Sequence, residues 1–124
     1  MQRTALQTTT GGNVSLAALG KWRESEWKYQ RRASVVALLP PPKETSGIAP
    51  LLDYLRPLMQ DPDKPVQQAL GWFLREAWKL APKPVEAFLL EHVATGPRQI
   101  FQTATEKMTA EKKARFKRPA KKLR

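Results

Sequence analysis

Apolar side chains along most of the chain recur at every third or fourth position, the spacing that places them on one face of an α-helix. The clearest example is the segment 64–80, whose apolar residues form one broad stripe. The members of that stripe are Val66, Ala69, Leu70, Phe73, Ala77 and Leu80, with Leu74 and Trp78 on its flank. No stretch alternates apolar and polar residues between turn signals, as a half-buried strand would. The pattern therefore predicts an all-α protein.

Prolines and glycines divide the chain into seven predicted helices, because proline removes a backbone donor and clashes with the preceding turn. The predicted ranges are 15–23, 24–39, 48–59, 64–80, 85–93, 98–108 and 110–117. Asn13 or Ser15 is expected to cap the first helix and Thr109 the last. Pro57 is expected to kink the end of the third helix.

The helices contain a weak internal repeat. The sequence QRRASVVAL at 30–38 overlays QQALGWFL at 67–74 when Ala33 is aligned with Ala69. Each copy is followed by a proline-containing break and a second leucine-rich helix. Helix pairs that recur every 35–47 residues or so are typical of HEAT-type solenoids, so we predict a short α-solenoid of HEAT-like antiparallel helix pairs. The core stripe of the earlier copy is predicted to be Tyr29, Ala33, Val36 and Ala37.

Both copies also carry tryptophan and arginine on a face turned away from the predicted core. The residues of this second face are Gln68, Trp72, Arg75 and Lys79 in the later copy, and Trp27 and Arg31 in the earlier one. A solenoid sets equivalent helices side by side, so the two faces should merge into one concave surface. Arginine binds phosphate through two parallel hydrogen bonds, and an indole offers a stacking platform, so this surface suits nucleic acid. The alternative is that Trp72 packs against a neighbouring helix and Arg75 belongs to an ordinary solvated face.

Gly71 lies between this second face and the Trp78 flank. A glycine inside a helix costs about 1 kcal/mol of helix propensity relative to alanine. The position therefore predicts the close approach of another backbone or of a ligand.

The net charge of +11 is concentrated at the C-terminal end. Residues 107–124 contain nine Lys or Arg and one acid, Glu111. Such a field favours polyanions, nucleic acid first, although a basic tail can also serve only solubility. We expect a flexible segment over 1–14, a helical domain over 15–117 and a basic disordered tail over 118–124.

Several classes of protein and site are disfavoured. The chain has no cysteine and a single histidine, His92, so neither a disulfide framework nor a zinc cluster is expected. No apolar run reaches the roughly 20 residues that span a bilayer, and the first residues lack the apolar centre of a signal peptide. We expect no metal, no cofactor, no membrane association and a cytoplasmic location, next to the nucleoid if the source is bacterial.

Three segments resemble the DNA alkylation repair proteins, the HEAT-like-repeat DNA glycosylases. They are WKYQRRASVVALL at 27–39, VQQALGWFLREAWKLAPKPVEAFLLEH at 66–92 and TATEKMTAEKKARF at 103–116. The resemblance covers about residues 16–117, in the family's order and spacing. It implies an α-solenoid whose concave basic face holds duplex DNA that carries alkylated bases.

In that family, tryptophans and a carboxylate stabilise the positive charge that develops on the sugar, without flipping the base into a pocket. Carried over by position, Trp72 matches an aromatic of that site. Arg31 and Arg75 match basic residues that hold the DNA backbone. The activity implied is that of a 3-methyladenine or 7-methylguanine DNA glycosylase.

One departure from the family pattern bears on catalysis. The family's catalytic Asp belongs to a W-D-x-x-D motif that would precede residue 15 here, and the chain contains no Trp-Asp pair. The other aspartates, Asp53, Asp61 and Asp63, fall in linkers or on the wrong helices, and no family position supports Glu24 or Glu26. Because an oxocarbenium ion needs a preorganised negative charge, we assign no catalytic residue and expect little excision by this chain alone. The chain resembles the C-terminal half of such a protein, truncated or decayed.

Three hypotheses remain. The first is a DNA-binding module of the alkylation repair type. The second is a HEAT-like scaffold fragment for protein–protein interaction, with a basic tail that binds nucleic acid nonspecifically. The third, which ranks last, is an active enzyme with a substitute carboxylate. In each, an open N-terminal end would expose an apolar helix face and so allow self-association.

Overall fold

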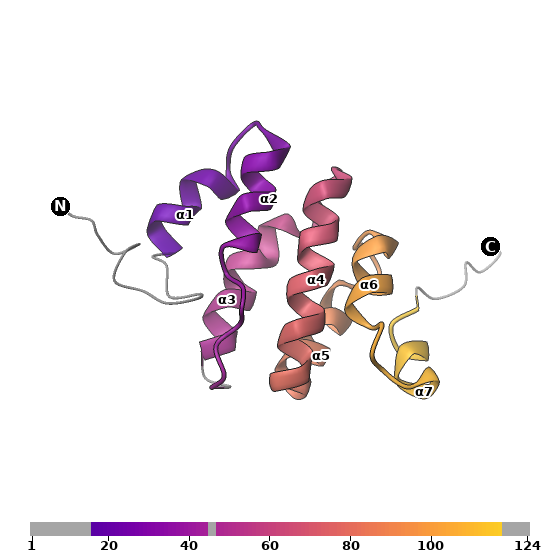
Figure 1. Ribbon diagram of the computed structural model, residues 1–124. Coiled ribbons are helices and arrows are strands. Elements are labelled where there is room, and N and C mark those ends of the chain that lie inside the picture. The colour runs from indigo at the N-terminus through magenta and orange to yellow at the C-terminus, as the bar shows by residue number, and fades with distance from the viewer. Residues whose placement is uncertain (1–15, 45–46, 118–124) are drawn as a thin grey trace.

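The computed structural model of the chain describes residues 16–44 and 47–117 (Figure 1). Throughout these residues the regular structure is helical and no strand is present, which confirms the all-α prediction. The predicted segment 1–14 and the predicted tail 118–124 lie outside the described residues, as do the proposed caps Asn13 and Ser15.

The described helices follow the predicted order. They are α1 (Leu16–Arg23), α2 (Lys28–Val36), α3 (Ile48–Leu55), the 3₁₀ helix η2 (Arg56–Gln60), α4 (Lys64–Leu80), α5 (Pro82–His92), α6 (Arg98–Ala104) and α7 (Ala110–Ala114). The bounds of α4 match the prediction at both ends. Pro57 marks a change of helix type, since α3 passes into η2 one residue before it. Thr109 caps α7 as predicted, because its side chain accepts a hydrogen bond from the Lys112 amide at 3.2 Å.

Several predicted bounds were wrong. Helix α2 ends at Val36 rather than Leu39, and α7 ends at Ala114 rather than Lys117. Helix α2 begins at Lys28 rather than Glu24, because Trp27 has extended backbone angles. Helix α5 begins three residues early, at Pro82, since proline is tolerated in a first helical turn. Helix α6 ends at Ala104, where Thr105 has left helical geometry and its hydroxyl donates to the Phe101 carbonyl oxygen at 2.7 Å.

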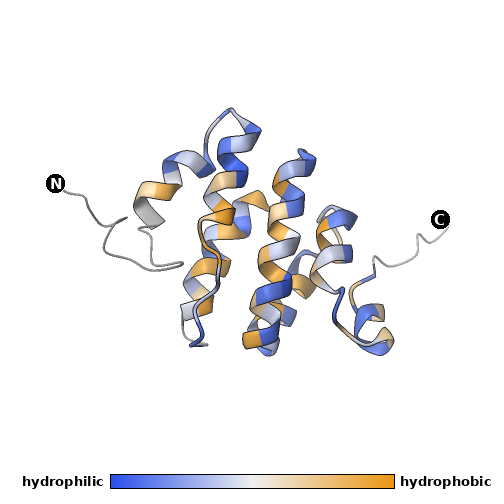
Figure 2. Ribbon diagram, viewed as in Figure 1, coloured by the Kyte–Doolittle hydropathy of each residue, from blue (hydrophilic) through white to orange (hydrophobic). Residues whose placement is uncertain are grey.

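The helices are arranged as a short α-solenoid in two layers. Figure 1 shows α2, α4 and α6 side by side in one layer, with α3 and α5 in a second layer behind them. Helix α4 packs against α2, α5 and α6 and is the central element. Figure 2 shows hydrophobic and hydrophilic positions alternating along these helices, as expected for amphipathic helices.

The core lies between the two layers and contains most of the predicted α4 stripe. Val66, Ala69, Leu70, Phe73, Leu74 and Ala77 are at most 1% exposed. Leu80 is 41% exposed, so its inclusion in the core was wrong; it lies in the last turn of α4. Trp78 packs against the core, and its indole N–H donates to Glu86 Oε2 at 2.7 Å, which confirms a structural role.

The predicted core stripe of the earlier copy was only partly correct, since Val36 and Ala37 pack against the core but Tyr29 does not. Tyr29 is 64% exposed, and Ala33, Val36 and Ala37 are half-buried. The α2 side that faces the core instead carries Ser34 and Val35, and Leu38 follows on the same side. Ser34 is tolerated there because its hydroxyl donates to the Arg31 carbonyl oxygen at 2.7 Å.

Gly71 is the point of closest approach between α4 and α6. A Cβ atom at this position would lie 2.6 Å from Thr103 Cβ and 3.2 Å from the Ile100 carbonyl oxygen. Of the two reasons for a glycine here, the structure supports close approach of another backbone. The missing side chain lets α6 lie directly against the flank of α4.

Part of the basic C-terminal stretch belongs to the folded domain. Met108 is 6% exposed and Phe116 is 1% exposed, so the segment around α7 buries apolar surface against the rest of the chain. Lys112 Nζ and Arg115 Nη1 donate to the two carboxylate oxygens of Glu86, on α5, at 3.0 and 3.1 Å. Removing residues 107–124 would therefore take away core as well as charge.

Candidate nucleic-acid interface

The outer face of α4 carries the predicted second face. Trp72 is 39% exposed, whereas its neighbour Phe73 is 0% exposed. Gln68 and Lys79 are exposed and Arg75 is half-buried, so the four predicted residues share the side of α4 away from the core.

Arg75 and Lys79 are held in a charge network along this face. Arg75 donates to Glu106 beyond the end of α6 and, at 3.3 Å, to Glu76. Lys79 Nζ lies 3.0 Å from the same Glu76 carboxylate. The hydrogen bond to Lys79 is the largest cause of a lowered pKa of Glu76, and the bond to Glu106 is the largest cause of a raised pKa of Arg75. The surface beside Trp72 is thus ordered but partly neutralised.

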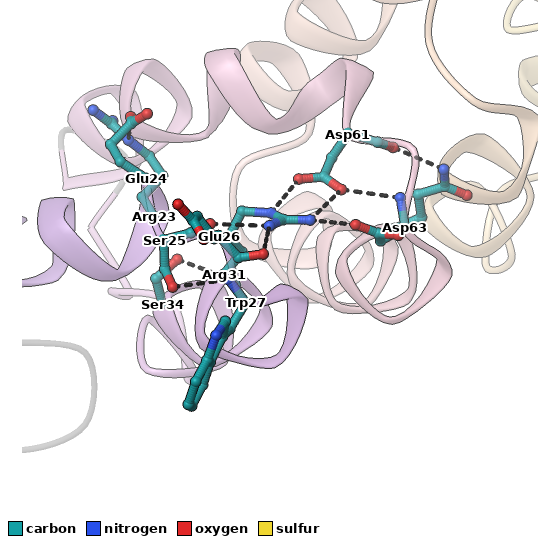
Figure 3. Close-up of polar contacts among 10 residues, drawn as sticks. Arg23, Glu24, Ser25, Glu26, Trp27, Arg31, Ser34, Asp61 and Asp63 are labelled. Carbon is teal, nitrogen blue, oxygen red and sulfur yellow. Dashed lines mark hydrogen bonds and ion pairs between the residues drawn. The ribbon is translucent and has the colours of Figure 1, made fainter.

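Arg31 occupies a different position from the one that a phosphate-binding residue would need (Figure 3). Its Nε donates to Asp61 Oδ2 at 2.8 Å, and its Nη2 donates to Asp61 Oδ1 at 3.3 Å and to Asp63. Its Nη1 donates to the carbonyl oxygens of Ser25 and Glu26 at 2.9 and 3.1 Å. A guanidinium has five N–H donors, and here each of the five has an acceptor.

This network joins three segments that are far apart in the sequence. Arg31 lies on α2, Ser25 belongs to the α1–α2 loop, and Asp61 and Asp63 lie just before α4. The Arg31 side chain is 14% exposed and that of Asp61 is 7% exposed, so the ion pair is largely removed from water. Hydrogen bonding to Asp61 raises the pKa of Arg31. Arg31 therefore fixes the start of α4 relative to α2.

Arg31 and Arg75 lie on opposite flanks of the outer face of α4. Arg31 binds the segment before α4 on the α2 side, and Arg75 binds Glu106 on the α6 side. The two arginines were expected on one merged surface with Trp72, but each guanidinium is bound to carboxylates on its own flank. The reason is tertiary: their carboxylate partners are about thirty residues away along the chain.

Trp27 is the most exposed aromatic side chain of the described residues, at 71%. Figure 3 shows its indole pointing away from the Arg31 network. It forms one wall of a shallow surface depression of about 360 Å³, lined also by Glu26, Lys28, Tyr29 and Asp63. The sequence reasoning missed Lys28 and Tyr29 here, because Tyr29 had been assigned to the core.

Arg32 was also missed, although it follows Arg31 directly. Its Nη1 donates to the Pro65 carbonyl oxygen at 2.8 Å in the first turn of α4. The two consecutive arginines of the QRRAS segment therefore both bind the start of α4. The pair of consecutive arginines was the sequence feature that could have indicated this role. Periodicity alone does not reveal that the hydrogen-bond acceptors of these arginines lie in the next repeat.

Most carboxylates in the described part of the chain are engaged by cations. Asp61 and Asp63 bind Arg31, Asp53 and Glu91 bind Arg56, and Glu24 binds Arg23. Glu26, beside Trp27, is exposed and has no ion pair among the described residues. Of the described carboxylates in the α1–α2 loop, Glu24 is paired with Arg23 and Glu26 is the unpaired one.

Two further searches of the described residues bear on function. They contain no group of three or more His, Asp or Glu side chains arranged to hold a metal ion. None of their helices combines the length and the apolar character that crossing a membrane requires.

Comparison with known proteins gives one finding. A family model described as DNA alkylation repair enzyme matches residues 5–108, from before α1 to the segment after α6. Neither the curated proteins nor the solved structures gave a significant match.

Proposed function

Because the chain belongs to the DNA alkylation repair enzyme family, we propose that it binds duplex DNA on the outer face of α2, α4 and α6. The observation that carries this proposal is Trp72, an indole 39% exposed on the polar face of the central helix. An exposed indole can make a stacking or apolar contact with a sugar or base. Trp72 is available for such a contact because it lies on the side of α4 away from the core.

Around Trp72, side chains suited to hydrogen bonding and to phosphate contact extend over the same layer. Gln68 lies one turn before Trp72 and is exposed. Lys28 and Lys64, in the first turns of α2 and α4, are exposed and have no ion pair among the described residues. The positive charge of these lysines is available to a phosphate without any rearrangement. Arg75 and Lys79 can bind a phosphate only after their glutamate partners are displaced.

Glu106 is the partner of Arg75 that a phosphate can displace. Its side chain is 54% exposed, and exposed ion pairs contribute little stability. Two oxygens of a tetrahedral phosphate can accept two hydrogen bonds from Arg75, whereas Glu106 accepts one from its Nη1. Arg31 has a positioning role in this proposal, since its five donors are occupied within the protein.

Base excision by this chain alone is not part of the proposal. The resemblance places the catalytic carboxylate in a W-D-x-x-D motif that the sequence lacks. Asp61 and Asp63 cannot substitute for it while both bind Arg31. We expect no release of 7-methylguanine from alkylated duplex. Robust turnover that is lost in Glu26→Gln would instead favour an enzyme with a substitute carboxylate.

The binding proposal is tested by fluorescence anisotropy with a labelled duplex. Trp72→Ala is expected to weaken binding about tenfold, since one stacking contact contributes about 1–3 kcal/mol. Trp22→Ala is the matched control, because Trp22 on α1 is also exposed, at 45%. Equal affinities for the two variants and the unmodified protein would exclude the Trp72 face.

The scaffold hypothesis predicts a different result in the same assay. If a basic tail alone binds nucleic acid, deleting residues 118–124 removes binding and Trp72→Ala has no effect. This shorter deletion is required, because Met108 and Phe116 belong to the core.

A further inference from the structure

A second cationic site lies at the C-terminal end of the solenoid, between α6 and α7. It is a pocket of about 350 Å³ whose lining includes three cationic side chains, Arg98, Lys113 and Lys117. Gln102 and Thr105 add polar groups, and no Asp or Glu among the described residues lines the pocket. Lys113 and Lys117 follow the last residue of the family match, whereas Arg98, Gln102 and Thr105 lie within it, so the site extends beyond the matched region.

The cations around α7 are divided between two sides. Lys112 and Arg115, three residues apart, both bind Glu86. Lys113 and Lys117, four residues apart, lie on the pocket side, and neither has an ion pair among the described residues. The cations neutralised by Glu86 and the cations that line the pocket are therefore different side chains, and the two sets are separated. The positive charge that remains is directed toward the pocket.

Arg98 is held in a fixed position at the pocket wall. Its Nη2 donates to the Phe116 carbonyl oxygen at 2.8 Å, and its guanidinium lies 5.0 Å from the centre of the Phe101 ring. Phe101 and Phe116 are each 1% exposed and form the apolar floor. A guanidinium held this way loses little conformational freedom when it binds an anion, and its planar shape suits phosphate oxygens.

We propose that the α6–α7 pocket binds a phosphate group. Three cations, two neutral polar side chains and no carboxylate match a ligand with several anionic oxygens. The identity of the ligand rests on the proposed function: it is a backbone phosphate of the duplex. The DNA-binding surface then extends from α4 past α6. Free phosphate offers the same oxygens, so the experiment has an arm for each source.

The first arm measures how the affinity of the full chain for a labelled duplex depends on salt. Each phosphate contact contributes about 0.9 to the slope of log K against log salt. Lys113→Gln/Lys117→Gln is expected to reduce that slope by about 1–2. Lys43→Gln/Lys83→Gln is the matched control, since it removes the same charge from exposed lysines without ion pairs among the described residues. A slope equal to that of the control would overturn backbone binding.

The second arm uses inorganic phosphate and the Nε–H signal of Arg98 in an NMR spectrum of the full chain. We expect a saturable shift that is lost in Lys113→Gln/Lys117→Gln. A shift without any change in salt slope supports a phosphate pocket and rejects the duplex as its occupant. No shift and no change in slope would overturn the proposal entirely.

Trp72→Ala separates this inference from the proposed function. If the lysine pair changes the slope and Trp72→Ala leaves affinity unchanged, the pocket is supported and the α4 face is not. If Trp72→Ala weakens binding and the lysine pair behaves like its control, the α4 face is supported and the pocket does not contact DNA.

Discussion

Replacing Arg31 with alanine should destabilise the fold far more than replacing an exposed arginine. The change removes five hydrogen bonds at once, three to carboxylates and two to the carbonyl oxygens of Ser25 and Glu26. It leaves Asp61, whose side chain is 7% exposed, without a cation. The loop before α2 and the segment before α4 also lose their common attachment.

The magnitude follows from the burial of the two carboxylates. Breaking a buried ion pair by removing one partner costs about 3–5 kcal/mol, because the remaining charge is left uncompensated. The low end applies here, since Asp63 is 37% exposed and Asp61 still accepts the Asp63 amide at 3.0 Å. We expect a loss of about 3 kcal/mol, against a total stability of about 5–15 kcal/mol for a domain of this kind.

Urea denaturation followed by circular dichroism measures this loss. With a slope of about 1–3 kcal/mol per molar urea, the midpoint should fall by roughly 1–3 M. Arg56→Ala is the control, because Arg56 also binds two carboxylates, Asp53 and Glu91, but the group is exposed and its removal should not be measurable. A midpoint for Arg31→Ala no lower than that for Arg56→Ala would refute the structural role.

The same result decides how binding data for Arg31 variants are interpreted. If Arg31→Ala is partly unfolded, weaker DNA binding reports lost structure rather than a lost phosphate contact. Arg31→Lys keeps the charge but cannot place five donors, so it should also destabilise the fold, though less. Affinities should therefore be compared only under conditions in which each variant is folded.

Two further substitutions test packing and charge. Gly71→Ala should destabilise the protein by about 1–2 kcal/mol, since overpacking outweighs the gain in helix propensity. Gly20→Ala, whose Cβ would have nothing within 4 Å, should instead stabilise the protein by about 0.5–1 kcal/mol. Melting temperatures of the two variants that shift in the same direction would contradict this. For Glu86, burial acts to raise the pKa, but donors from Trp78, Lys112 and Arg115 outweigh it, so the pKa lies below the usual value of 4.5. The carboxylate therefore stabilises the fold above that value and ceases to do so as the pH falls through its lowered pKa. Glu86→Gln should cost about 2 kcal/mol at pH 7. The urea midpoints of the two proteins should converge as the pH falls below 4.5 through the lowered pKa of Glu86; a difference in midpoint that stays constant as the pH falls would contradict this.

The strongest sequence signals were local and periodic. The α4 stripe from Val66 to Ala77 was predictable because it repeats over more than three turns, and the same periodicity placed Trp72 outside the core. The α7 cap at Thr109 was predictable from residue type and spacing alone. Tyr29 was placed wrongly because α2 is short and polar, so a few apolar residues fit more than one stripe.

The roles of the charged residues depended on contacts between repeats. Arg31 and Arg75 looked alike on helical wheels, yet one is enclosed by its acceptors and the other has an exposed partner. Lys112 and Lys113 are adjacent in the sequence, but only Lys112 reaches Glu86. Such distinctions require the position of α5 relative to α7, which no local pattern contains.

The four indole N–H signals in an NMR spectrum of the full chain report most directly on where DNA binds. Upon addition of duplex, the Trp72 signal should shift progressively, while the Trp78 signal, whose N–H donates to Glu86, should stay in place. Single Trp→Phe variants assign the four signals. The shifts of the Trp72 and Trp78 signals can then be compared within one spectrum of the unmodified protein. A Trp72 signal unmoved at saturating duplex would contradict binding at the outer face of α4.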